Sequence, residues 1–189
     1  MRNKIIGLLG IVLSSMFLSG CATKGTITNL DKVKPDDAIM VAKFRILYNG
    51  EDVTKKCALM FGSASGFECA LDETGYIFAQ VSPGPLNLKF VCIRGWSGHS
   101  FEPDEITCQL AGGGVVNYLG DVTVDWQGKS RGSIMALSIV SPIAGSVTGV
   151  GTTTVSVGSH LAEAQAAFQR QFKTNRILTP ALLVVKTQQ

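Results

Sequence analysis

Charged side chains are scarce in this sequence of 189 residues. Only 16% of the residues are Asp, Glu, Lys or Arg, whereas 46% are hydrophobic. This composition excludes a disordered chain, which combines low hydrophobicity with high net charge. The formal net charge of +3 is too small for the basic surface of a nucleic-acid-binding protein. The length is that of one ordinary domain, and it is sufficient to bury a hydrophobic core.

Residues suited to catalysis are also few. The chain has two histidines, His99 and His160, and it contains neither a Gly-x-Ser-x-Gly nor a Cys-x-x-Cys motif. His99 lies between Cys92 and Cys108, but these spacings match no compact zinc motif. The glycines 112–114 lead into an expected strand rather than a helix, so they do not form a phosphate-binding loop. We therefore expect a protein that is not an enzyme and that has no metal site and no cofactor.

The N-terminus has the pattern of an export signal. Arg2 and Lys4 precede a run of fourteen uncharged residues, Ile5–Leu18. A membrane-spanning helix needs roughly 20 apolar residues, so this shorter run is more typical of a signal peptide. The run ends in the letters LSGC, residues 18–21, which resemble the lipobox of bacterial lipoproteins. The resemblance implies that residues 1–20 are a signal peptide and that Cys21 carries lipid; an ordinary signal peptide with a chance cysteine is the alternative.

The same resemblance implies a location. In Gram-negative lipoproteins an Asp directly after the lipidated cysteine retains the protein in the inner membrane, whereas Ala22 stands here. We therefore expect a mature protein that is anchored to the outer membrane through lipid on Cys21 and that faces the periplasm. Loss of Arg2 and Lys4 with the signal would leave 15 basic against 14 acidic side chains, which supports no basic binding patch.

A flexible tether and a β-domain are expected next. Residues 21–36 are polar, lack any period and include Pro35, as is typical of a tether. Residues 37–127 contain short runs of alternating apolar and polar residues, separated by turns rich in Gly and Pro. This pattern predicts an antiparallel β-sandwich. The expected strands are 38–48, 57–61, 67–71, 76–81, 86–93, 105–110 and 115–126.

Residues 128–189 are expected to pack on the same domain. From Gly132 to Ser159 the chain has no Asp, Glu, Lys or Arg, but Pro142 and several glycines interrupt this run. Two strands, 134–140 and 152–157, are therefore favoured over a membrane segment. Two interpretations remain open, namely a buried hairpin or a surface that contacts another envelope protein or another copy of the chain.

A single amphipathic helix is predicted near the C-terminus. Leu161, Ala164 and Phe168 follow one another at spacings of three and four, which places them on one face of a helix over residues 160–173. Ser159 is the expected N-cap. A closing strand is expected over residues 181–185. The predicted fold class is therefore a mainly β, antiparallel β-sandwich with one C-terminal amphipathic α-helix.

The sequence has five cysteines, and lipid on Cys21 would account for the one that cannot form a disulfide within the chain. Cys57, Cys69, Cys92 and Cys108 remain, each in phase with the apolar face of its expected strand. In the oxidising periplasm four inward cysteines predict two disulfides. We favour the pairing of Cys92 with Cys108 and of Cys57 with Cys69, and four buried, inert thiols are the alternative.

A glycine-rich loop within residues 94–104 is the candidate binding surface. Arg94, Trp96, His99 and Phe101 would present aromatic and charged groups above a disulfide base. The alternative is a loop folded over the sandwich.

Two stretches carry a second resemblance. The letters ETGYIFAQVSPGPLNLKFV (73–91) and VVNYLGDVTVDW (115–126) resemble the small β-sandwich domains related to carboxypeptidase regulatory-like and PEGA domains. The resemblance implies a non-catalytic role. We expect a structural or assembly lipoprotein, such as an accessory subunit of a secretion system, pilus or flagellar ring. Its partners would be other envelope proteins or copies of itself, and not nucleic acid; the alternative is a periplasmic ligand-binding or hydrolase-inhibitor module that uses the 94–104 loop.

Overall fold

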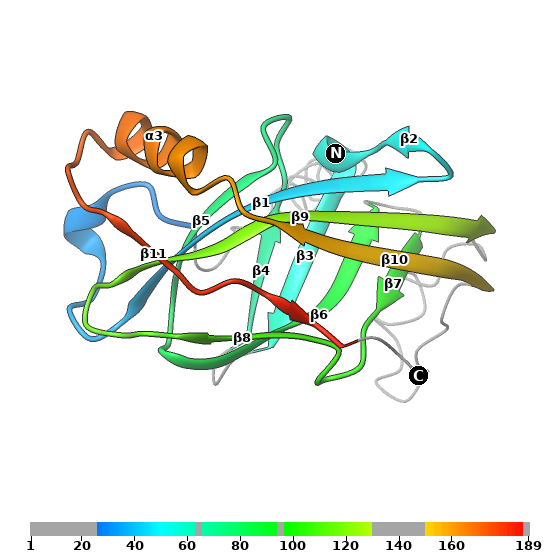
Figure 1. Ribbon diagram of the computed structural model, residues 1–189, viewed down its shortest axis with the longest axis horizontal. Helices are drawn as coiled ribbons and strands as arrows, with labels where there is room; N and C mark the ends of the chain where they lie inside the picture. Colours follow the sequence, from blue (N-terminus) through cyan, green and yellow to red (C-terminus); the bar gives the residue numbers. More distant parts are fainter. Residues whose placement is uncertain (1–25, 63–65, 94–96, 130–149, 187–189) are drawn as a thin grey trace, which may run out of the picture.

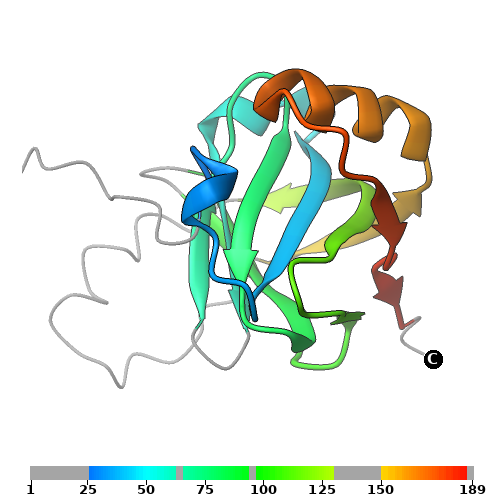
Figure 2. The ribbon, with the colours of Figure 1, turned by 90° about the vertical axis from the view of Figure 1, so that its left-hand side faces the viewer.

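Twelve strands and one α-helix dominate the described part of the chain. The computed structural model describes residues 26–62, 66–93, 97–129 and 150–186, and these strands form two sheets that pack face to face (Figure 1). Helix α3 (Leu161–Phe172) covers the outer face of the first sheet, as the view from the side shows (Figure 2). The expected mainly β sandwich with one C-terminal helix is confirmed. The expected signal peptide, Cys21 and the strand 134–140 lie outside the described residues.

The first sheet is built around two long central strands. β1 and β9 lie side by side in parallel, with β5 and β2 on the far side of β1 and with β10 and β11 on the far side of β9. β11 is also parallel to β9. This sheet is therefore mixed, whereas the sequence predicted antiparallel pairing throughout. Its strands are β1 (Ala38–Tyr48), β2 (Glu51–Asp52), β5 (Tyr76–Val81), β9 (Val116–Lys129), β10 (Val150–Gly158) and β11 (Leu178–Pro180).

The second sheet is antiparallel. Its order is β12-β8-β6-β3-β4, and β7 also pairs with β6. The short helical turns η2 (Leu30–Lys32) and η3 (Thr54–Lys56) complete the described elements. The strands of this sheet are β3 (Cys57–Gly62), β4 (Phe67–Ala70), β6 (Gly84–Ile93), β7 (Ser97–Ser100), β8 (Ile106–Leu110) and β12 (Val184–Val185).

β1 contributes to two hydrophobic cores. Successive side chains of a strand point to opposite faces. Met40 and Phe44 therefore face the second sheet in the main core, whereas Ile39 and Val41 face helix α3 in a second core. The buried face of α3 that meets them contains Phe168, as the helical spacing predicted. Burial on both faces explains why residues 38–42 are almost uninterrupted apolar residues.

Two β-bulges, in β6 and β9, change which alternate side chains of these strands point into the main core. On β6 the register places Phe90 opposite Met60 but Leu88 opposite Phe61, so Lys89 is the extra residue. On β9 the register of the β1 pairing shifts around Gly120, whose φ of +105° suits only glycine. Because a bulge adds one residue, the side chains before and after it exchange faces.

Residues 26–36, expected to belong to the tether, are part of the domain. The amide of Ile27 donates to the carbonyl of Phe78 over 2.8 Å, and Thr26 forms a bridge with Ala79 of β5. Ile27 is buried in the second core, and Leu30 and Val33 pack against it. The boundary expected at residue 37 is therefore wrong, because three apolar side chains spaced by three residues dock this segment on the domain.

Of the expected closing strand 181–185, only the end forms a strand, β12, and a further short strand, β11, precedes it. β11 ends at Pro180 and pairs with β9, whereas β12 pairs with β8 of the other sheet. Leu183 lies between them and is buried in the main core. The expected second strand of the apolar region corresponds to β10, which forms its hairpin with β9.

Candidate functional site

The four described cysteines form no disulfide with one another. The expected pair Cys92 and Cys108 is excluded by register, because Cys108 lies opposite Leu86 and Cys92 lies six positions further along β6. Six strand positions correspond to roughly 20 Å. The two Cα atoms of a disulfide are no more than about 7 Å apart. This expectation is wrong because the loop after β6 forms β7, which occupies the place next to Cys92.

The expected pair Cys57 and Cys69 is offset as well. Cys69 lies opposite Leu59 on β3, so Cys57 is its diagonal neighbour two positions away. Diagonal neighbours are about 7–8 Å apart, which exceeds the reach of a disulfide. The thiol of Cys57 instead donates to the carbonyl of Val53 over 3.3 Å. Burial raises the pKa of the Cys69 thiol to about 12, so this group stays protonated at neutral pH.

Only Cys57 and Cys69 point fully into the main core. The bulge at Lys89 turns Val91 and Ile93 inward and Cys92 to the opposite face of the sheet. A regular alternation of side chains along residues 86–93 had predicted that Cys92 points inward. Cys108 is partly buried against the main core, and burial raises its pKa to about 12.

The candidate binding loop is mostly strand and core in the structure. Arg94 and Trp96 lie outside the described residues. Phe101 is buried in the main core, and the ring of His99 lies 4.8 Å from that of Phe101. The His99 ring also lies 6.0 Å from Trp126, and its Nδ1 is 3.3 Å from the hydroxyl of Thr153 on β10. Both described members of the expected surface are thus packed inward, as in the alternative of a loop folded over the sandwich.

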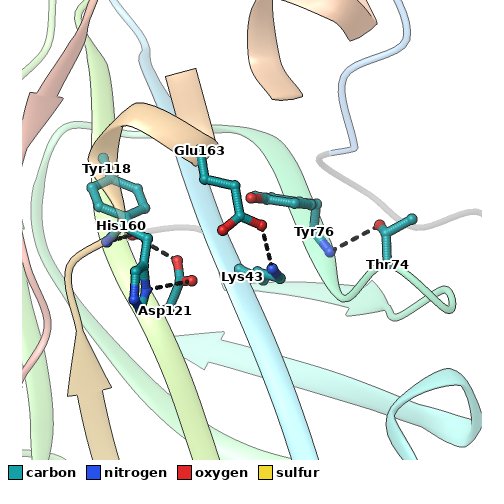
Figure 3. A network of polar contacts seen from close by, with 7 residues as sticks. All are labelled: Lys43, Thr74, Tyr76, Tyr118, Asp121, His160 and Glu163. Carbon is teal, nitrogen blue, oxygen red and sulfur yellow. Dashed lines mark hydrogen bonds and ion pairs between the residues drawn. The ribbon is translucent and has the colours of Figure 1, made fainter. Parts of the chain in front are cut away.

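A polar network joins helix α3 to the first sheet (Figure 3). The hydroxyl of Tyr118 on β9 donates to Asp121 over 2.6 Å and accepts the backbone N–H of His160 over 3.0 Å. The Nδ1 atom of His160 lies 3.0 Å from the other oxygen of Asp121. Burial raises the pKa of Tyr118, and its hydrogen bond to Asp121 raises it further. The hydroxyl therefore remains a donor at physiological pH.

The second half of this network ties α3 to β1. The ammonium of Lys43 donates to the carboxylate of Glu163 over 2.7 Å and lies 5.2 Å from the centre of the Tyr76 ring (Figure 3). This hydrogen bond raises the pKa of Lys43 and lowers that of Glu163. The hydroxyl of Tyr76 is buried and faces the Glu163 carboxylate, and no described residue lies at full hydrogen-bonding distance from it. The network thus holds the first turn of α3 against the sheet.

The N-cap of α3 is His160 and not the expected Ser159. No side-chain capping hydrogen bond is present there, and the amide of His160 is bound by Tyr118 instead. The contact between the Asp121 carboxylate and the His160 ring resembles part of a catalytic triad. However, the groups bound to it are a tyrosine hydroxyl and a helix amide, which suit attachment of the helix rather than nucleophilic catalysis.

Shallow hollows surround the C-terminal half of α3. One of them, of about 460 Å³, lies between the segment 26–28, β5 and the helix, with Asp72 and Arg170 among its lining residues. A second, of about 410 Å³, lies between Thr28 and Arg176. Sequence reasoning did not single out this end of the molecule. The sequence does indicate a basic surface here, because residues 164–189 contain Lys and Arg but no Asp or Glu.

β10 is the other exposed feature. It pairs with β9 on one side, and no described strand pairs with its other edge. Val155 and Val157 pack against the main core, whereas Thr152, Thr154 and Ser156 are exposed. An edge of this kind offers unpaired backbone N–H and C=O groups to another strand.

Within the described ranges no group of three or more His, Cys, Asp or Glu side chains is placed to hold a metal ion. No helix in this part of the chain is long and apolar enough to cross a bilayer. Comparison of the chain with protein-family models, with curated proteins and with solved structures finds no match.

Proposed function

We propose that this chain is an outer-membrane lipoprotein with a structural or assembly role in the cell envelope. The observation that carries the proposal is the LSGC sequence at residues 18–21, directly behind a basic start and an uncharged run of fourteen residues. Each buried methylene of an acyl chain contributes about 0.8 kcal/mol, so a multiply acylated Cys21 would hold the domain stably at the membrane.

The edge of β10 with which no described strand pairs supports the assembly role. An edge strand of nine residues with no charged side chain has none of the Lys or Pro residues that block edge-to-edge pairing. Addition of a strand from another envelope protein, or from a second copy, would satisfy its backbone groups. The binding-loop alternative has less support, because Phe101 is buried and His99 packs against Trp126.

Lipidation is tested by expression of the full chain in a Gram-negative bacterium with radiolabelled palmitate. We expect label in the wild type and in Cys108→Ser, and no label in Cys21→Ser. Membrane fractionation on a density gradient should place the labelled protein with the outer membrane. Equal labelling of Cys21→Ser and wild type, or no label in either, would contradict the proposal.

The edge of β10 is tested by photo-cross-linking in intact cells. A photoreactive residue at Thr154 should give a discrete cross-linked species that the same residue at Glu73, an exposed position in a turn, does not give. Ser156→Lys should abolish that species, because an edge lysine opposes strand addition. Identical products at both positions would count against strand addition at β10.

A further inference from the structure

An exposed isoleucine lies among cations at one end of the molecule. Helix α3 ends at Phe172, and the chain continues through Lys173, Arg176 and Ile177 into β11. The side chain of Ile177 is 77% exposed, more than any other large hydrophobic side chain in the described part. The connection from α3 to β11 lies at the same end of the sandwich as the blue turn η2 (Figures 1 and 2).

Five basic side chains are exposed at this end. None of them has an acidic partner within 4.0 Å among the described residues, although Asp31 and Asp36 lie on the same segment as two of them. Arg176 lines one hollow together with Lys34 and another together with Lys173, so the η2 segment and the end of α3 form one surface. The five are Lys32, Lys34, Arg170, Lys173 and Arg176.

We propose that this end is a membrane-contact surface. Ile177 enters the interfacial region of a bilayer, and the surrounding cations contact the phosphates of anionic phospholipids. An exposed apolar side chain at the same end of the molecule as five Lys and Arg side chains suits this partner, because a lipid interface offers hydrocarbon directly behind a layer of negative charge. These cations form no ion pair within 4.0 Å with a described residue, and they outnumber Asp31 and Asp72, the acidic side chains that line the same hollows.

The position of the chain entry agrees with this orientation. The inference deepens the proposed anchoring at Cys21 and rests on it. Four residues separate Cys21 from Thr26, and five peptide steps span at most about 18 Å. Thr28, two residues further on, lines the same hollow as Lys173 and Arg176. A lipid on Cys21 would therefore hold this end of the domain, rather than the end with β2, near the bilayer.

The test uses the lipidated full chain in vesicles of phosphatidylcholine, with or without phosphatidylglycerol. A polarity-sensitive fluorophore is attached to Ile177→Cys and, as a matched control, to Glu51→Cys on exposed β2 at the other end of the first sheet. We expect a blue shift at position 177 on vesicles with phosphatidylglycerol and none at position 51. The double variant Lys173→Glu with Arg176→Glu should lose the shift, as should wild-type charges in ~1 M salt.

The outcomes separate the surface from the anchor. Failure of the anchor appears as an unmodified Cys21 by mass spectrometry and as protein that does not float with the vesicles. Protein that floats but gives the same spectrum at positions 177 and 51 overturns the contact surface alone. A shift at position 177 that requires an added acidic protein, and that phosphatidylglycerol does not produce, also overturns it.

Discussion

Tyr118 and Tyr76 both face helix α3, but only one of their hydroxyls is hydrogen-bonded. The Tyr118→Phe variant lacks the hydroxyl that joins Asp121 to the amide of His160, so each of these two groups loses a hydrogen-bond partner. Loss of one partner of a buried hydrogen bond costs about 1–3 kcal/mol. We expect the free energy of unfolding in urea to fall by that amount. Tyr76→Phe is the matched control and should cost less, because the Tyr76 hydroxyl faces Glu163 beyond hydrogen-bonding distance; an equal loss for both variants would refute this account.

The cysteines allow a chemical test of the register. Because Cys57 and Cys69 lie in the main core and burial raises the pKa of Cys69 to about 12, they should react slowly with iodoacetamide at pH 7.5 in the folded protein. In denaturant without reductant, all four cysteines downstream of Cys21 should be alkylated. Intact mass spectrometry measures the number of additions. Only two additions, or none, would mean that disulfides form after all.

His99 should make stability depend on pH. Burial lowers its pKa below the ordinary value of 6.5, so the folded protein binds this proton more weakly than the unfolded chain does. The stabilising contribution is therefore fully present above pH 6.5, and it is lost as the pH falls through the folded-state pKa. The free energy of unfolding, measured from pH 8 to pH 5, should decline less steeply in His99→Gln than in wild type. The difference in free energy of unfolding between the two proteins at pH 8 gives the packing cost of the substitution. Curves that run parallel from pH 8 to pH 5 would show that His99 does not cause the pH dependence.

The bulge in β9 changes which alternate side chains of the strand face each core. Val116 and Tyr118 face α3 before it, whereas Val122 and Val124 face the main core after it. A Cβ on Gly120 would lie 2.7 Å from a methyl carbon of Val157. Because φ is +105°, backbone strain adds to this clash.

We expect Gly120→Ala to lower the free energy of unfolding by about 2–4 kcal/mol. Gly113→Ala is the matched control, since Gly113 also has a positive φ but a Cβ there would meet nothing within 4 Å. Its cost should be about 1 kcal/mol, from the backbone alone. Urea denaturation followed by circular dichroism measures both variants. Equal costs would show that the contact with β10 is unimportant.

Strand positions followed from the sequence more readily than strand partners. The period of two in residues 38–48 and 76–81 depends only on local burial, and both strands have the expected bounds. The parallel pairing of β1 with β9 joins residues 77 or 78 positions apart in the sequence, which alternation does not encode. The disulfide expectation failed for a related reason, because the register places Cys92 six positions from the partner of Cys108 and makes Cys57 only a diagonal neighbour of Cys69, and alternation does not encode register.

The site was harder to predict than the fold. Tyr118, Asp121 and His160 come together only because α3 returns to the outer face of the first sheet, and no local pattern indicates that contact. His99 and Phe101, which were expected to be exposed, are packed inward instead, since the strand β7 pairs with β6 and brings His99 to Trp126.

Because β1 is buried on both faces, the two cores should unfold together. Phe168 is fully buried in the second core and contacts Phe78 and Phe172, so Phe168→Ala should cost about 3–5 kcal/mol. Phe172→Ala, at a half-buried position of the same helix, should cost less. In a Trp96→Phe background the fluorescence of Trp126 follows the main core, and circular dichroism follows all the secondary structure. In both variants the two signals should change at the same urea concentration, since loss of α3 uncovers Ile39 and Val41 on a strand that the main core requires. A separate early transition seen only by circular dichroism would show instead that α3 and the second core unfold independently of the sandwich.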